Sequence, residues 1–537
     1  MWTEQQILDG VEKLTLDQLV GQTLCFQADS ISAEEYAELV KKTMPGGIYY
    51  HNITPEQKKS ALEAHNKYCP VPTVCVADVE NGAIMVEGGS AIPNPMAWGA
   101  TDDAELIKET HHSIAKCCRK NDVHLALAPV VDINYNFRSS VVNIRAISDS
   151  PNQVIKIGRA AVEGFQQDNL VAACCKHFPG DGVDERNQHF MTTVNSLSKE
   201  EWMNTYGRVY REMIDAGTMA IMVAHIALPA FDEKIDDYLG YPPASLSKNL
   251  MQELLRETLG FKGCIVSDAL SMIGACSIVP LEKLSLEFLK AGGDMLLFPL
   301  PSDFDYIKAA VESGELPLER LKDAVIHIWQ LKNKLGLLDS YEEIKEKTEV
   351  DTKTSALAQE IADKAINVIR DGDGILKNIH IKPGDKVLNI LAIPDNHRAA
   401  KYTITTVEEE LKARGVEVTT LINPMHYKIK EIQDDYDYIL FNICYTPVNN
   451  DGSSMRMNWK NAMAMWRGYI FQHPRLIAAS FGDPYKLYDY PYLKTYVNCF
   501  GDTDVMQRAY VRFLTGEIKA VGKSPIALPG FFERETD

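Results

Sequence analysis

Short apolar runs alternate with amphipathic segments through the first 340 residues of the chain. Eight runs have the length and residue types of buried strands, at 21–28, 47–51, 73–78, 124–133, 171–177, 219–226, 264–268 and 294–299. Helical spacing of apolar positions lies between them, as at 102–121, 152–168, 198–216 and 247–259. Buried strands that alternate with amphipathic helices form parallel βα units, and eight such units predict a closed (β/α)8 barrel of the TIM type.

The pattern changes after residue 340. Residues 341–384 are charged and prone to form helix, which predicts a linker with a connecting helix. A second alternating series then predicts further strands at 386–393, 415–422, 438–444, 475–481 and 495–500. We therefore expect an α/β protein with a catalytic barrel at 1–340 and a smaller α/β sandwich domain at 385–537, whose sheet is mostly parallel. This second series contains no GxGxxG or P-loop run, so nucleotide binding has no support.

Charged or imidazole side chains stand at the same end of five successive predicted strands. They are Asp78 on the third strand, Asp132 on the fourth, Lys176 and His177 on the fifth, His225 on the sixth and Asp268 on the seventh. Packing explains one or two buried polar groups at strand ends, but it does not explain five in succession. In such barrels catalytic residues gather at the carboxyl ends of the strands, so the sequence predicts an active site there.

The loop after the fifth predicted strand is rich in side chains that can take part in catalysis. Residues 176–189 read Lys-His-Phe-Pro-Gly-Asp-Gly-Val-Asp-Glu-Arg-Asn-Gln-His, which brings basic, acidic and imidazole groups together on one glycine-containing loop. A loop of this composition at a strand end is typical of a functional site.

Composition narrows the classes of partner. The 537 residues carry 55 Lys and Arg against 74 Asp and Glu, a net charge of −19, which disfavours nucleic acids and anionic membranes. The first residues lack a basic segment followed by an apolar one, and no uninterrupted apolar run is long enough to span a membrane, so we expect a cytoplasmic protein. The 11 cysteines lie largely in apolar runs without CxxC spacing, which predicts reduced packing residues, no metal site and no cofactor.

Several motifs resemble glycoside hydrolase family 3. Residues 176–180 match the family's KHFPG loop, and 260–272 look like the strand that bears its nucleophilic aspartate. Further matches follow in family order at 76–82, 220–226 and 291–296, and the stretch from 480 to 529 resembles the family's second α/β domain. His189 stands where the β-N-acetylglucosaminidases of the family carry a catalytic histidine.

The resemblance implies a retaining exo-β-N-acetylglucosaminidase. Asp268 would attack the anomeric carbon, and His189 would protonate the departing oxygen and then deprotonate water. An imidazole suits both roles because its ordinary pKa is about 6.5. The resemblance also implies sugar-binding and orienting residues. The sugar-binding positions are Asp78, Arg145, Lys176 and His177, and the orienting positions are Asn187, Asp184 and His225. Asp132 is expected to support the scaffold, and Lys176 could also form an ion pair with it.

Three departures from the family pattern bear on mechanism. The triplet Asn187-Gln-His189 stands in place of the usual Asp-Ser-His. His189 would therefore lack a charged partner, unless the carboxylate of Asp184 or Glu185 serves as one. The run from Glu80 to Val86 lacks the arginine that many bacterial members carry, which puts acidic aglycones in doubt. An alanine follows Asp268 where a second aspartate is common, and this should keep the pKa of Asp268 lower.

Other functions stay open. The wider family contains β-glucosidases and β-xylosidases. A phosphorylase, in which phosphate replaces water, would benefit from an acid/base group that repels anions less than a carboxylate does. A sugar-binding protein that has lost catalysis is the alternative from another class, motivated by Asn187.

In the second domain, a polar loop carries Arg456 and Trp459, which either contact an aglycone or belong to a solvated loop. The expected partner is a small carbohydrate, bound by a monomer or homodimer.

Overall fold

A computed structural model describes residues 1–537 except 51–52, 85, 351, 394–403, 446–462 and 466. The chain folds into two compact units. The first comprises Met1–Ser90, Lys108–Asp132 and Gly158–Thr354, and the second comprises Ala91–Ile107, Ile133–Ile157 and Ser355–Asp537. Two segments from the first third of the sequence therefore group with the second unit.

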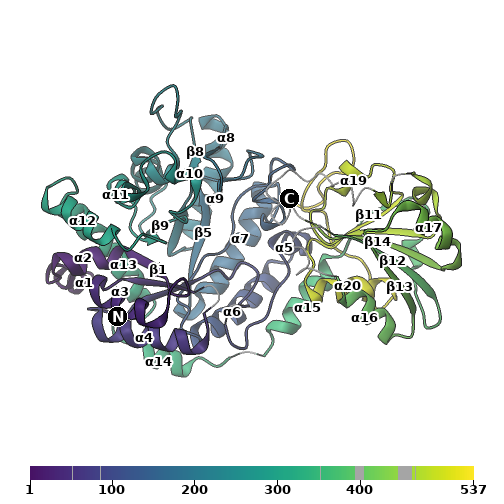
Figure 1. The fold of residues 1–537 in the computed structure, drawn as a ribbon, viewed down its shortest axis with the longest axis horizontal. Coiled ribbons are helices and arrows are strands. Elements are labelled where there is room, and N and C mark those ends of the chain that lie inside the picture. Colours follow the sequence, from purple (N-terminus) through teal and green to yellow (C-terminus); the bar gives the residue numbers. More distant parts are fainter. Residues whose placement is uncertain (51–52, 85, 351, 394–403, 446–462, 466) are drawn as a thin grey trace. The chain divides into compact units, whose positions relative to one another are not determined.

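The first unit is built on an eight-stranded parallel sheet in the order β10-β1-β2-β3-β4-β5-β7-β9. The strands are β1 (Leu24–Gln27), β2 (Gly47–Tyr50), β3 (Val74–Ala77), β4 (Leu125–Ala126), β5 (Ala172–Phe178), β7 (Ala220–Val223), β9 (Cys264–Ser267) and β10 (Leu296–Leu297). A parallel bridge between Val266 and Met295 brings β9 to the start of β10 and joins the two ends of the sheet. The predicted barrel is confirmed (Figure 1).

Helices alternate with these strands, and their first residues explain where several begin. The helices are α1 (Glu4–Glu12), α2 (Leu16–Thr23), α3 (Ala33–Thr43), α4 (Pro55–Tyr68), α6 (Ala104–Lys120), α7 (Pro151–Gln166), α8 (Lys199–Asn204), α9 (Tyr206–Asp215), the π-helical η4 (Asn249–Thr258), α10 (Ile273–Cys276), α11 (Leu281–Ala291), α12 (Asp303–Glu312), α13 (Leu318–Lys334) and α14 (Tyr341–Lys347). Reciprocal caps between a Ser or Thr and a Gln or Glu three residues later start α1, α2, α3, α4 and α8.

Several predicted elements differ in extent from those observed, and the cause is clear for three of them. Residues 21–23 belong to α2, because the Thr15 cap starts a helix that runs directly into β1. The expected strand at 124–133 is regular only over Leu125–Ala126, since Pro129 cannot donate to the ladder. The expected helix at 198–216 divides at Thr205, whose φ of −120° and ψ of −91° are not helical.

The second unit contains a six-stranded sheet in the order β11-β16-β15-β14-β12-β13. Its strands are β11 (Asn367–Asp371), β12 (Lys386–Ala392), β13 (Glu417–Ile422), β14 (Tyr438–Ile443), β15 (Leu476–Ser480) and β16 (Thr495–Asn498). All pairs are parallel except β11 with β16, so the range 341–384, expected to be a linker, includes an antiparallel edge strand. Its helices include α5 (Pro95–Thr101), α15 (Thr354–Ala365), α16 (Thr406–Ala413), α17 (His426–Ile432), α19 (Lys486–Asp489) and α20 (Asp504–Leu514).

Within this unit α16 and α20 lie side by side (Figure 1). All 11 cysteines are free thiols, and all except Cys69 and Cys276 are buried. Among the helices of the described residues, none combines the length and the apolar character that crossing a membrane requires.

Candidate active site

Asp268 follows β9 directly and is held at the carboxyl end of the barrel by main-chain bonds. Its N–H donates to Val223 O at 3.0 Å, and its Oδ1 accepts from the N–H of Ala269 at 2.8 Å. Burial alone would raise the pKa of this carboxyl. The positive charge that His177 and His225 carry when protonated, together with the Ala269 N–H, nevertheless holds the pKa below its ordinary value. The group is therefore an ionised carboxylate at neutral pH.

His177 lies in β5, and Asp132 fixes its ring. The His177 Nδ1 lies 2.7 Å from Asp132 Oδ2, and Asp132 Oδ1 accepts from the main-chain N–H groups of His177 at 3.2 Å and Asp181 at 2.8 Å. Asp132 is fully buried. Its carboxylate therefore orients the imidazole and ties the start of the following loop to the barrel.

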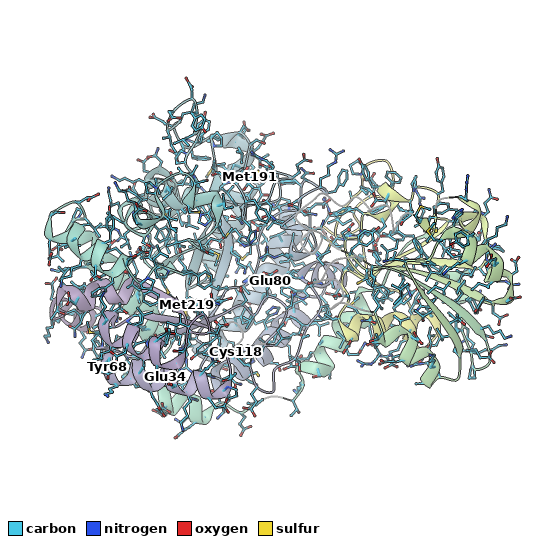
Figure 2. The ribbon with its side chains drawn as sticks, viewed as in Figure 1. Glu34, Tyr68, Glu80, Cys118, Met191 and Met219 are labelled. Atoms are coloured by element: carbon cyan, nitrogen blue, oxygen red, sulfur yellow. The ribbon has the colours of Figure 1, made fainter. Side chains whose placement is uncertain are left out.

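Lys176 forms ion pairs with two carboxylates of the loop after β3. Its ammonium lies 3.2 Å from Asp78 Oδ1 and 3.2 Å from Glu80 Oε2 (Glu80 is labelled in Figure 2). The Lys176 side chain is only 5% exposed, whereas that of Asp78 is 45% exposed. Tyr49 donates its hydroxyl to Asp78 Oδ2 at 2.7 Å. Asp78 is thus a carboxylate that two neighbours hold in place while nearly half of its side chain stays exposed.

The loop from residue 179 to 195 turns sharply after β5. Gly180 has a φ of +115°, and a Cβ there would come within 2.1 Å of the Tyr206 ring, so only glycine fits. Further along, Asn187 Oδ1 accepts from the His189 N–H at 2.9 Å and lies 2.7 Å from His189 Nδ1. The amide oxygen therefore fixes the orientation of the His189 ring. The ring nitrogen that does not face Asn187 is Nε2.

Asp184, the other expected orienting residue of this loop, bonds to different groups. Its carboxylate accepts from Arg186 Nη2 at 2.6 Å and Nε at 2.9 Å, and it also accepts from the Val194 N–H at 3.0 Å. Burial raises the pKa of Asp184, but these donors outweigh it and lower the pKa overall. This carboxylate braces the two sides of the loop.

The loop of residues 179–195, which we call the His189 loop, is attached to the loop after β9, which carries Asp268. The Ile273 N–H donates to His189 O at 3.1 Å, and the Thr192 hydroxyl donates to Gly274 O at 2.7 Å. A short parallel pair, β6 (Thr193–Val194) with β8 (Ile226–Ala227), attaches the same loop to the segment that follows β7. The structure therefore brings His189 to Asp268, and His189 contributes to the lowered pKa of that carboxyl.

His225, just beyond β7, is fully buried and bonded on both sides of its ring. Nδ1 lies 2.8 Å from Ser245 Oγ, Nε2 lies 3.0 Å from Ala269 O, and the main-chain N–H donates to Gln188 Oε1 at 3.2 Å. Burial lowers the pKa of this imidazole, an effect that the nearby Asp268 charge opposes. His225 thus links the His189 loop to the residue that follows Asp268.

Arg145 is in η1 (Asn143–Arg145) of the second unit, where its Nη1 donates to Val141 O at 3.3 Å. Arg456 and Trp459 lie outside the described residues. Sequence reasoning gave no role to Tyr49, Gln188 or Ser245. Glu80 was also given no role, although its position could have indicated one, because it lies two residues beyond Asp78 at the same strand end.

The arrangement joins an ionised carboxylate, an oriented imidazole and a group of hydrogen-bonding side chains at the carboxyl end of a parallel barrel. Residues 15–331 match the model of the glycosyl hydrolase family 3 N-terminal domain, which covers more than half of the chain. The chain belongs to glycosyl hydrolase family 3. It is accordingly a glycoside hydrolase whose substrates are carbohydrates.

Relatives within family 3 cover almost the whole chain. A beta-N-acetylglucosaminidase/beta-glucosidase from Cellulomonas fimi is 29% identical over 528 residues, which are 95% of this chain and 93% of the relative. The structure of a beta-N-acetylglucosaminidase from Paenibacillus sp. strain FPU-7 matches with a TM-score of 0.80 at 26% identity, covering 96% of this chain and 99% of the other. The structure of a beta-glucoside phosphorylase bound to 2FGlc matches with a TM-score of 0.84 at 26% identity, covering 98% and 96%.

Proposed function

We propose that the protein is a retaining exo-β-N-acetylglucosaminidase that removes terminal β-linked N-acetylglucosamine. The observation that supports this proposal is the attachment of the His189 loop to the loop that carries Asp268, together with the contribution of His189 to the lowered pKa of that carboxyl. A nucleophile that stays ionised and an acid/base group beside it are the two parts that a retaining glycosidase needs.

In the first step, an Asp268 oxygen attacks the anomeric carbon and forms a glycosyl ester. The bond from that carbon to the leaving oxygen breaks, and His189 gives its proton to that oxygen. In the second step, neutral His189 takes a proton from water while the water oxygen attacks the same carbon. The ester bond breaks, Asp268 regains its charge, and the two inversions together retain the β-configuration.

The sugar itself would contact the group around Lys176. Asp78 and His177 present a carboxylate and an imidazole that Tyr49 and Asp132 hold in place, so each can form directional hydrogen bonds with ring hydroxyls. Lys176, whose ammonium pairs with Asp78, completes the set of the first unit that we assign to the substrate. Holding the sugar by several fixed groups lowers the entropic cost of reaching the transition state.

Phosphorolysis is the second candidate reaction. The group beside His189 Nδ1 is the neutral amide of Asn187, so the acid/base pair adds no negative charge that would repel an incoming phosphate. The similarity to a beta-glucoside phosphorylase supports the same reaction. Glucosides are also candidate substrates, because the Cellulomonas fimi relative bears both activities in its name.

The direct test compares initial rates on chromogenic β-N-acetylglucosaminide and β-glucoside, with and without phosphate, in the wild type and in Asp268→Ala. We expect a preference for the N-acetyl sugar and a loss of at least about 10⁴-fold in the variant. Formation of a sugar 1-phosphate would assign phosphorolysis. Binding of N-acetylglucosamine without turnover of either substrate would overturn the proposal in favour of a sugar-binding protein.

A further inference from the structure

We propose that three exposed apolar side chains beside His189 make the enzyme select substrates with an apolar leaving group. We call these side chains, Phe190, Met191 and Ile273, the apolar rim. The inference deepens the proposed function, because it rests on His189 as the group that protonates the leaving oxygen.

The apolar rim is exposed although its members are large and hydrophobic. Phe190 is 55% exposed, Met191 is 41% exposed and Ile273 is 48% exposed (Met191 is labelled in Figure 2). Single exposed apolar residues are common on protein surfaces, but a cluster beside a catalytic group usually marks a binding surface.

Hydrogen bonds hold the apolar rim together around His189. Ile273 donates its N–H to His189 O at 3.1 Å, and the Thr192 hydroxyl reaches Gly274 O at 2.7 Å, so 190–192 lie against 273–274. The Phe190 ring centroid is 6.5 Å from that of His189. The rim is therefore fixed to the residue that transfers the proton.

The position of the leaving group follows from proton transfer. The leaving oxygen must come within about 3 Å of His189 Nε2, so the first carbons bonded to that oxygen lie next to the neighbours of His189. An alkyl or aryl group placed there removes rim surface from water. A second sugar would instead place hydroxyl groups against side chains that cannot form hydrogen bonds with them.

The nearby charged groups do not favour an acidic leaving group. Arg186, a cation on the same loop, donates to both carboxylate oxygens of Asp184. On the loop after β3, the run from Glu80 to Val86 has no basic residue, and Ile84 in that run is 58% exposed.

The test uses methyl and hexyl β-N-acetylglucosaminides, because their leaving alcohols have similar acidity and differ mainly in apolar surface. We expect a higher kcat/KM for the hexyl substrate, and a hexyl-to-methyl ratio that falls by about tenfold in Phe190→Ala. Phe190→Leu should keep most of the ratio, whereas Phe190→Gln, which is similar in size to the Leu variant but polar, should lose it. A merely structural role for Phe190 would affect both variants equally.

Leu318→Ala is the matched control, since Leu318 is 41% exposed at the start of α13 and should leave both rates unchanged. Equal kcat/KM values for the two substrates in the wild type, or a ratio that Phe190→Ala leaves intact, would overturn the inference. Failure of the proposed function gives a different result, namely no turnover of either N-acetylglucosaminide. A parallel glucoside series separates a wrong sugar from a wrong leaving group.

Discussion

Asn187 is the residue whose chemistry most distinguishes this site from a charged acid/base pair. Its amide oxygen meets His189 Nδ1 at 2.7 Å and accepts from the His189 N–H, so the orientation of the imidazole is kept. The negative charge of the usual aspartate is absent, however, and a neutral amide stabilises an imidazolium less than a carboxylate does. The protonated form of His189 therefore depends on other groups of the site.

We expect Asn187→Asp to keep His189 protonated, and so able to donate its proton, up to a higher pH. A carboxylate at this distance favours the imidazolium, so the basic limb of the pH profile of kcat/KM should move up by about one pH unit. The rate on poor leaving groups should rise by about tenfold, and any phosphorolysis should fall because the new charge repels phosphate. Initial rates from about pH 5 to 9 test this. An unchanged rate and an unchanged profile would contradict the role that we assign to the triplet.

Residue positions were easier to predict from the sequence than residue partners. The alternating pattern placed Asp78, His225 and Asp268 at strand ends, and the structure has each of them just beyond its strand. Their partners could not be predicted, because Tyr49 bonding to Asp78 and Ser245 bonding to His225 join segments that are remote in the chain. Such contacts depend on how the closed barrel brings its loops together.

Among the elements, the short helix α10 sets the position of the His189 loop. A Cβ on Gly274 would lie 2.3 Å from Gln188 O and 3.1 Å from both His225 Cβ and Met191 O. These neighbours include main-chain atoms, which cannot turn away as a flexible side chain can. A glycine at this position therefore permits the close approach that joins the two loops.

We expect Gly274→Ala to displace His189 and to lower kcat by about 10²-fold on substrates with poor leaving groups. Activated aryl glycosides need less proton donation, so their rates should fall less. Gly158→Ala in α7 is the control, because its Cβ would meet other atoms only at 3.4 Å or more. Equal losses on both kinds of substrate would count against His189 as the acid.

Helices α2 and α13 enclose a lysine that the proposed mechanism does not use. Lys332 is fully buried, and its ammonium donates to Gln22 Oε1 at 2.8 Å, an oxygen that Trp329 Nε1 also approaches at 3.1 Å. Burial lowers the pKa of Lys332 from 10.5 to about 7. Between these two values the unfolded chain binds more protons at this lysine than the folded chain does, so stability should rise with pH.

We expect Lys332→Met to raise stability at pH 7 by about 3 kcal/mol, because it removes the cost of neutralising a buried ammonium. The gain should shrink as the pH approaches about 10, where the unfolded lysine also begins to lose its proton. Melting temperatures of both proteins across this range provide the measurement. A variant that is destabilised equally at every pH would show that packing, and not charge, governs this position.

For the molecule as a whole, the order of elements was predictable but the limits of the two units were not. Eight strand-like runs predicted the barrel, since buried parallel strands leave a strong apolar pattern. β11 was missed because five residues at a sheet edge look like the end of the preceding helical pattern. The grouping of 91–107 and 133–157 with the second unit depends on contacts between segments that are remote in the chain, which no local pattern reports.

The proposed mechanism requires that Asp268 become covalently bonded to the sugar. A 5-fluoro-N-acetylglucosaminyl fluoride, a substrate whose glycosyl ester breaks down slowly, would trap this bond for mass spectrometry of the intact chain and of its peptides. We predict one sugar per chain, located on the peptide that contains Asp268 and absent from Asp268→Ala. A label on a different carboxylate, or steady turnover by Asp268→Ala, would contradict the mechanism.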